Sequence, residues 1–177
     1  MKKTSAAVPG SKQSRAGKPD TLVVYYSRSG KTKKVAEDLA GRLGADLEAI
    51  ADRKPRAEGF FGYMNCGRQA SFRIASAIKD PSRDPATYDK VVVLTPVWSW
   101  NVSPPVRTWL RLMKGKIRTA VFVTVSGNTE PEKIVAEMTK ESGLQPLAVA
   151  SFVASDFAPE NSAVYEAKVA KIVDLMK

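Results

Sequence analysis

Short apolar runs alternate with helix-like segments along most of this chain, and this alternation constrains the fold more than any other feature. Four of the runs are rich in β-branched and aromatic side chains, as buried strands are, and a more polar fifth is expected nearer a sheet edge. The expected strands are Leu22–Tyr26, Asp46–Ile50, Val91–Leu94, Ala120–Val125 and Leu147–Val153. Continuous apolar strands with helices between them indicate a parallel α/β sheet covered on both faces.

The segments between the strands carry helix signals. Proline is tolerated in a first helical turn, as at Pro104 and Pro131, and Gly143 is placed to end a helix. The expected helices are Thr32–Leu43, Phe61–Ile78, Pro104–Met113, Pro131–Gly143 and one capped by Asn161 or Ser162. Right-handed crossovers would make this a three-layer, doubly wound sheet.

The length of 177 residues favours one folded domain, expected at residues 21–177. Residues 1–20 hold five basic side chains against Asp20, within a net charge of +10, and are expected to be a disordered basic extension. An arm that contacts an anionic surface is the alternative. The extension has no aromatic side chain to stack on bases, so a nucleic-acid partner is not expected.

The remaining composition excludes several classes of site. The chain has no histidine, which removes Ser-His-Asp catalysis and histidine metal sites, and no metal is expected. Its single cysteine, Cys66, is expected to be a half-buried small side chain and agrees with a cytoplasmic location. No apolar run approaches the roughly 20 residues of a membrane helix, so membrane insertion is not expected.

Ligands of doubly wound sheets bind outside the carboxyl ends of the strands. The first loop at such an end combines hydroxyls, a glycine and two cations. Glycine permits close backbone approach, and the N–H groups of a helix start favour an anion. The loop therefore predicts a phosphate site formed by Ser27, Arg28, Ser29, Gly30, Lys31 and Thr32.

A P-loop for nucleotide phosphates is the rival interpretation, because Gly30-Lys31-Thr32 matches the end of that motif. Its first glycine would fall at position 25, where a bulky Tyr25 stands. No apolar run ends in an aspartate that could hold magnesium. The P-loop reading therefore stays a minor alternative, beside a serine-rich turn that binds nothing.

The segment Val23–Leu39 resembles the flavodoxin signature, in which apolar and aromatic strand residues precede a hydroxyl, a small residue, a threonine and a helical alanine. The resemblance implies the strand order 2-1-3-4-5 and one FMN, whose phosphate this loop would wrap. The cations Arg28 and Lys31 depart from the mostly uncharged loop of that family.

The second and third strand-end loops would then hold the flavin ring. Trp98 and Trp100 offer aromatic platforms, although the sequence does not say which of them stacks. The expected contacts in these loops are Thr95, Pro96, Val97, Trp98, Ser99, Trp100, Ser126, Gly127 and Asn128. No aromatic residue lies between Ser126 and Pro131, so one flavin face is expected to be open to a substrate or covered by Phe60, Phe61 or Tyr63.

The resulting function is electron transfer through bound FMN, with no catalytic side chain required. The chain could be a carrier serving a redox-protein partner, or a reductase passing electrons from NAD(P)H to a quinone-like acceptor. Electron carriers of this family are usually acidic, so the charge of +10 argues mildly for the reductase. A P-loop-like nucleotide-phosphate enzyme and a non-catalytic scaffold remain alternatives, and the oligomeric state, including a homodimer, stays open.

Overall fold

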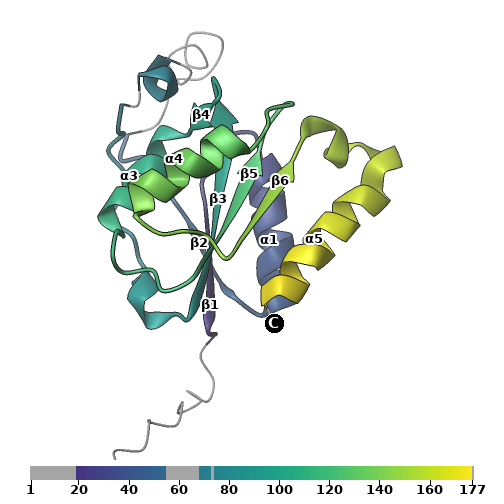
Figure 1. Ribbon diagram of the computed structural model, residues 1–177, viewed down its shortest axis with the longest axis horizontal. Helices are drawn as coiled ribbons and strands as arrows, with labels where there is room; N and C mark the ends of the chain where they lie inside the picture. The colour runs from purple at the N-terminus through teal and green to yellow at the C-terminus, as the bar shows by residue number, and fades with distance from the viewer. Residues whose placement is uncertain (1–18, 55–67, 73, 177) are drawn as a thin grey trace, which may run out of the picture.

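In the computed structural model, the described residues 19–54, 68–72 and 74–176 form a parallel sheet between two pairs of helices (Figure 1). The strands lie in the order β2-β1-β3-β5-β6, and a short β4 pairs antiparallel with the end of β3. Their bounds are β1 Thr21–Tyr25, β2 Asp46–Ala49, β3 Lys90–Trp98, β4 Asn101–Val102, β5 Ala120–Val125 and β6 Ala148–Phe152. The doubly wound α/β fold and the order 2-1-3-4-5 of its five parallel strands are confirmed, and the polar β2 lies at an edge.

The helices are divided between the two faces of the sheet. Helices α1 (Lys31–Leu43) and α5 (Ser162–Met176) cover one face, and α3 (Pro104–Leu112) and α4 (Glu132–Ser142) cover the other. Three short 3-10 helices complete the regular structure: η1 Pro85–Thr87, η2 Ala154–Phe157 and η3 Pro159–Asn161. Within the described part of the chain, no helix combines the length and the hydrophobicity of a membrane span.

Successive side chains along a strand point to opposite faces of the sheet, so the buried side chains form two cores, one on each face. Along β1, Leu22 and Val24 pack toward α3 and α4, whereas Val23 and Tyr25 pack toward α1 and α5. Trp109 of α3 is 1% exposed and packs in the first of these cores. The central strands are therefore buried on both sides, which explains why their sequences are continuous apolar runs.

Two expected boundaries were wrong. The third strand does not end at Leu94 but continues to Trp98, because the chain folds back there into the hairpin with β4. The expected helix Phe61–Ile78 is helical at residues 68–71, but residues 74–78 are not helical. Their backbone groups are engaged elsewhere: Arg53 N–H donates to the Ala77 carbonyl, and Ile78 forms a bridge with Asp52.

Several predictions fall outside the described residues. These are the basic extension up to residue 18, Cys66, and the aromatic candidates Phe60, Phe61 and Tyr63.

Candidate functional site

The loops after β1, β3 and β5 emerge at the same edge of the sheet, because the three strands are parallel neighbours (Figure 1). The third loop is also tied to the segment after β6, since Ala154 N–H donates to the Gly127 carbonyl at 3.1 Å. The sequence-predicted loops are thus brought together at one edge, and the loop after β6 joins them.

The first loop is a tight turn that leads directly into α1. Gly30 has a φ of 88°, a left-handed conformation that glycine adopts without strain. Its N–H donates to the Ser27 hydroxyl at 3.1 Å. Among the described residues no side chain caps α1, and its first turn carries no acidic residue. The first-turn N–H groups are therefore available to an anion, which the helix dipole favours.

The side chains of this loop divide into buried and exposed ones. Thr32 is buried beneath the turn, whereas Ser29 and Lys31 are exposed and Arg28 is partly buried. The Lys31 ammonium lies 5.4 Å from the ring centroid of Phe157 in η2. The loop is thus a positively charged turn with an aromatic wall on one side.

Sequence reasoning missed Phe157. The rule that ligands sit at the carboxyl ends of parallel strands applies to β6 as well, but only the loops after the first, third and fourth parallel strands were selected. Phe157 packs at 6.4 Å from Phe152, the last residue of β6, and at 5.7 Å from Tyr165 of α5. These contacts anchor the aromatic wall to the core.

The second loop is a two-residue hairpin turn between β3 and β4. Ser99 and Trp100 have φ values of 46° and 57°, which such turns normally assign to glycine or asparagine. Trp98 is partly buried and meets the Tyr26 ring, whereas Trp100 is 67% exposed. The hairpin therefore turns one tryptophan toward the core and leaves the other at the surface.

The residues before the turn lie within β3 and not in a loop. The Thr95 side chain is fully buried, and its hydroxyl lies 3.2 Å from the Ser103 hydroxyl and accepts a hydrogen bond from the Ser103 N–H at 3.3 Å. Pro96 and Val97 are partly buried. The Thr95 side chain therefore braces the base of the hairpin.

The third loop places backbone groups at the edge. The Ser126 side chain is buried and its hydroxyl accepts a hydrogen bond from the Thr129 N–H at 3.0 Å, which closes the turn. Gly127 and Asn128 are exposed. A Cβ added at Gly127 would have no atom of the described residues within 4 Å, so these residues leave open space beside the turn.

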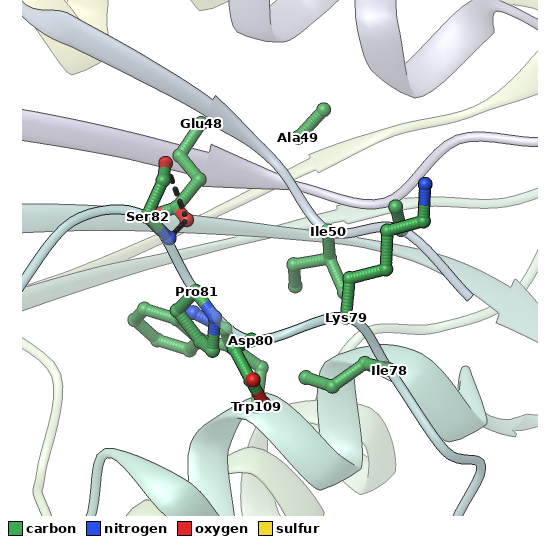
Figure 2. A pocket seen from close by; sticks show the side chains of 10 residues that line it. Glu48, Ala49, Ile50, Ile78, Lys79, Asp80, Pro81, Ser82 and Trp109 are labelled. Carbon is green, nitrogen blue, oxygen red and sulfur yellow. Dashed lines mark hydrogen bonds between the residues drawn. The ribbon is translucent and has the colours of Figure 1, made fainter. Parts of the chain in front are cut away.

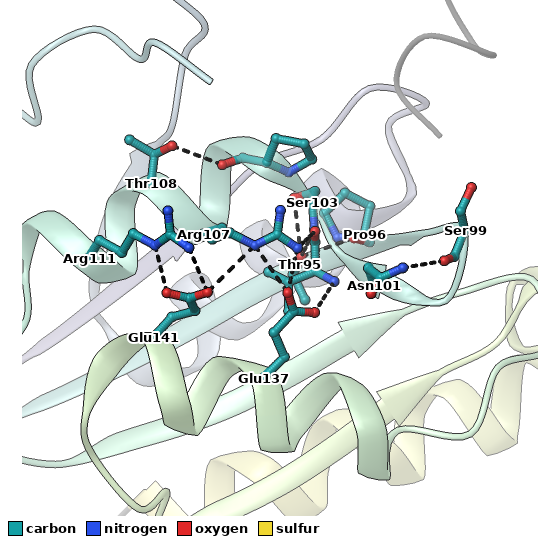
Figure 3. A network of polar contacts seen from close by, with 12 residues as sticks. Thr95, Pro96, Ser99, Asn101, Ser103, Arg107, Thr108, Arg111, Glu137 and Glu141 are labelled. Carbon is teal, nitrogen blue, oxygen red and sulfur yellow. Dashed lines mark hydrogen bonds and ion pairs between the residues drawn. The ribbon is translucent and has the colours of Figure 1, made fainter. Parts of the chain in front are cut away.

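A buried ion pair lies beneath the hairpin, and nothing in the sequence analysis pointed to it (Figure 3). Arg107 of α3 and Glu137 of α4 have side-chain exposures of 0% and 6%. Both are ordinary charged residues on amphipathic helices in the sequence. Only the crossing of α3 and α4 reveals that they face each other.

A separate pocket lies at the β2 edge, between the end of that strand, residues 78–82 and Trp109 (Figure 2). None of the predicted site residues lines it. Glu48 accepts hydrogen bonds there from the Ser82 N–H at 2.6 Å and the Ser82 hydroxyl at 3.2 Å. Glu48 Oε2 and Trp109 Nε1 are buried without a hydrogen-bond partner among the described residues.

Comparisons with known proteins agree with the fold. The sequence matches the family model described as Flavodoxin over residues 20–153. A flavoprotein of Lactobacillus acidophilus NCFM, solved in complex with FMN, is 24% identical with a TM-score of 0.66, covering 82% of this chain and 96% of its own. Oxidised Flavodoxin 2 of Bacillus cereus is 10% identical with a TM-score of 0.53, covering 88% and 95%. None of the curated proteins compared with the chain matches it.

Proposed function

Because the chain belongs to the flavodoxin family, we propose that it binds one FMN at the carboxyl edge of its sheet and transfers electrons through it. The observation that carries this proposal is the first loop. A glycine in a left-handed conformation opens a helix that has no side-chain cap and no acid in its first turn, and two cations flank it. This combination suits a dianionic phosphate group.

The residues present fit FMN. A Cβ at Gly30 would have no atom of the described part of the chain within 4 Å, so that part leaves open space beside the turn that would hold the phosphate. The hydroxyls of Ser27, Ser29 and Thr32, and the charges of Arg28 and Lys31, would bind its oxygens.

The ring would lie between the hairpin and the third loop. The exposed Trp100 would supply an aromatic platform, and the backbone groups of the exposed Gly127 and Asn128 would bind the polar edge of the flavin. When bound, FMN supplies the electron-accepting ring, and the chain contributes orientation, stacking and electrostatics.

The P-loop alternative is less well supported by the geometry. Tyr25 occupies the position of the first P-loop glycine, and it is the last residue of β1, with 8% exposure. A buried strand residue at that position does not open a phosphate-binding turn. Burial also raises the pKa of the Tyr25 hydroxyl, so the side chain stays neutral.

We also propose that the electron donor is NAD(P)H and the acceptor a quinone-like compound. The net charge of +10 favours binding of a phosphate-bearing electron donor. Electron carriers of the family, which dock on redox-protein partners, are usually acidic. A cytoplasmic location belongs to the same proposal and is supported by the single cysteine.

The test is a spectrum and an assay of the purified chain. A yellow protein that releases FMN on denaturation is expected, followed by NADH or NADPH oxidation in the presence of a quinone. A flavin-loaded protein that oxidises neither NADH nor NADPH in the presence of a quinone would refute the reductase and support an electron carrier. A colourless protein that does not bind added FMN would support the non-catalytic scaffold. Magnesium-dependent ATP binding would support the nucleotide-phosphate enzyme.

A further inference from the structure

We propose that the buried pair Arg107–Glu137 is a positioning pair, which holds the tryptophan hairpin at residues 98–101 in place at the flavin site. The inference rests on the proposed function. It adds a role for two residues that lie beneath the hairpin and belong to none of the three loops.

The pair contacts the backbone of β4 directly. The Val102 N–H donates to Glu137 Oε2 at 3.0 Å, and the Val102 carbonyl accepts from Arg107 Nη2 at 3.2 Å. In an antiparallel hairpin, alternate residues direct both backbone groups away from the partner strand. At Val102 these two outward groups are bound by Glu137 and Arg107, so the ion pair takes the place of a neighbouring strand.

The energetics favour a geometric role over a stabilising one. Arg107 Nε donates to Glu137 Oε1 at 3.0 Å, and Arg107 Nη2 binds the same oxygen. Arg107 Nη1, however, is buried without a partner among the described residues. A buried ion pair often contributes no more stability than apolar residues of similar volume, because both charges lose their hydration. Apolar residues could not bind the two backbone groups of Val102.

The hairpin needs such a support. Ser99 and Trp100 both adopt positive φ values without being glycine, a conformation that persists only where the surroundings impose it. β4 has only two residues, so its own pairing with β3 is short. The ion pair holds β4 on the side that faces away from β3, and it thereby sets the position of Trp100.

The experiment compares three variants of the full chain. Glu137→Gln keeps the shape but cannot accept from both Arg107 and the Val102 N–H. Arg107→Met combined with Glu137→Met keeps the volume and removes both charges, so it covers the case in which the first variant fails to fold. Arg111→Gln is the matched control, because Arg111 joins the same two helices through Glu141, at 2.6 and 2.9 Å, and among the described residues its side chain makes no hydrogen bond to β4.

Two measurements distinguish a failure of the positioning role from a failure of the proposed FMN binding. Hydrogen exchange at the Val102 amide is measured without flavin, and the dissociation constant of FMN is measured together with quenching of flavin fluorescence. We expect Glu137→Gln and the double variant to speed exchange at Val102 and to weaken FMN binding about tenfold, while Arg111→Gln changes neither.

Unchanged exchange at Val102 in folded variants would overturn the positioning role, whether or not flavin binds. Faster exchange with unchanged FMN affinity and quenching would also overturn it, because the hairpin would then be held without consequence for the flavin. A wild-type chain that binds no FMN would instead refute the proposed function.

Discussion

The ring of Tyr26 meets Trp98 edge-on, with the ring centroids 5.6 Å apart and the planes at 82°. The Tyr26 hydroxyl also donates to Asp52 at 2.8 Å. Tyr26 directly follows β1, so this contact fastens the hairpin to the strand that leads into the proposed phosphate loop. The two tryptophans of the hairpin therefore differ in their surroundings: Trp98 packs against Tyr26, whereas Trp100 is exposed and is the one that we propose to stack on the flavin.

The first prediction distinguishes the two tryptophans by substitution. Trp98→Ala should lower the free energy of unfolding by about 2 kcal/mol, because it removes a partly buried aromatic contact. Trp100→Ala should change it by less than about 0.5 kcal/mol, because the side chain is mostly in solvent. Urea unfolding of the flavin-free protein measures both values.

Flavin binding should depend directly on Trp100, although this side chain contributes little to stability. Trp100→Ala is expected to weaken FMN binding roughly three- to tenfold and to reduce quenching of flavin fluorescence, since a stacking contact is lost. Trp100→Phe is the control that keeps an aromatic face. A Trp100→Ala protein with wild-type affinity and quenching would show that the exposed tryptophan does not stack.

The second prediction concerns the glycine that opens α1. Gly30→Ala places a Cβ on a residue with a φ of 88°, which should cost about 1–2 kcal/mol of stability and weaken FMN binding. Gly41→Ala is the matched control in the same helix, where the added methyl also meets no atom within 4 Å. It should raise stability by about 0.5–1 kcal/mol, because alanine is the better helix former. Equal effects at both positions would contradict a requirement for the left-handed turn.

The fold could be predicted because the apolar runs, which are the strongest sequence signals, are also the segments that the structure buries. The runs at β1, β3 and β5 are predominantly apolar, and the structure buries most of their residues on both faces of the sheet. The turn that we propose to bind phosphate could be placed between β1 and α1 for a related reason, because a strand run, a glycine and a helix start follow one another directly. Local sequence decides both features.

The parts that could not be predicted depend on contacts between distant segments. The extension of β3 to Trp98 depends on β4, which has only two residues and no strand signal of its own. The end of the helix expected at Ile78 was missed because Asp52 pairs with that residue across the chain. The Arg107–Glu137 pair forms only where two helices cross.

The third prediction tests whether Lys31 binds the FMN phosphate. Lys31→Ala should weaken binding of FMN several-fold but leave binding of riboflavin, which lacks the phosphate, nearly unchanged. Lys33→Ala is the control on the same helix, since its ammonium is exposed and lies 3.6 Å from Glu37. The expected difference should shrink as salt is added. An equal loss of FMN and riboflavin would mean that Lys31 acts on the ring site and not on the phosphate.

The last prediction is a pH dependence of stability that originates at Asp38, where α1 meets α5. Its carboxylate accepts from the Tyr165 hydroxyl at 2.5 Å and from Lys34 at 2.9 Å. Burial opposes ionisation of Asp38, but the hydrogen bonds from Lys34 and Tyr165 outweigh it and hold the pKa below its usual 3.8. Burial and Asp38 together raise the pKa of Tyr165 well above its usual range, so the phenol stays a donor.

A pKa that is lower in the folded state means that ionised Asp38 stabilises the fold above the unfolded pKa, near pH 4. This contribution is lost as the pH falls below that value and through the folded pKa. Asp38→Asn should therefore flatten the acid limb of the free energy of unfolding, by no more than about 1 kcal/mol because the carboxylate is partly solvated. Glu37→Gln is the control, since that side chain is half exposed. Parallel acid limbs in the wild type and in Asp38→Asn would place the acid sensitivity at another carboxylate, such as Glu141, whose pKa the hydrogen bond from Arg111 also lowers.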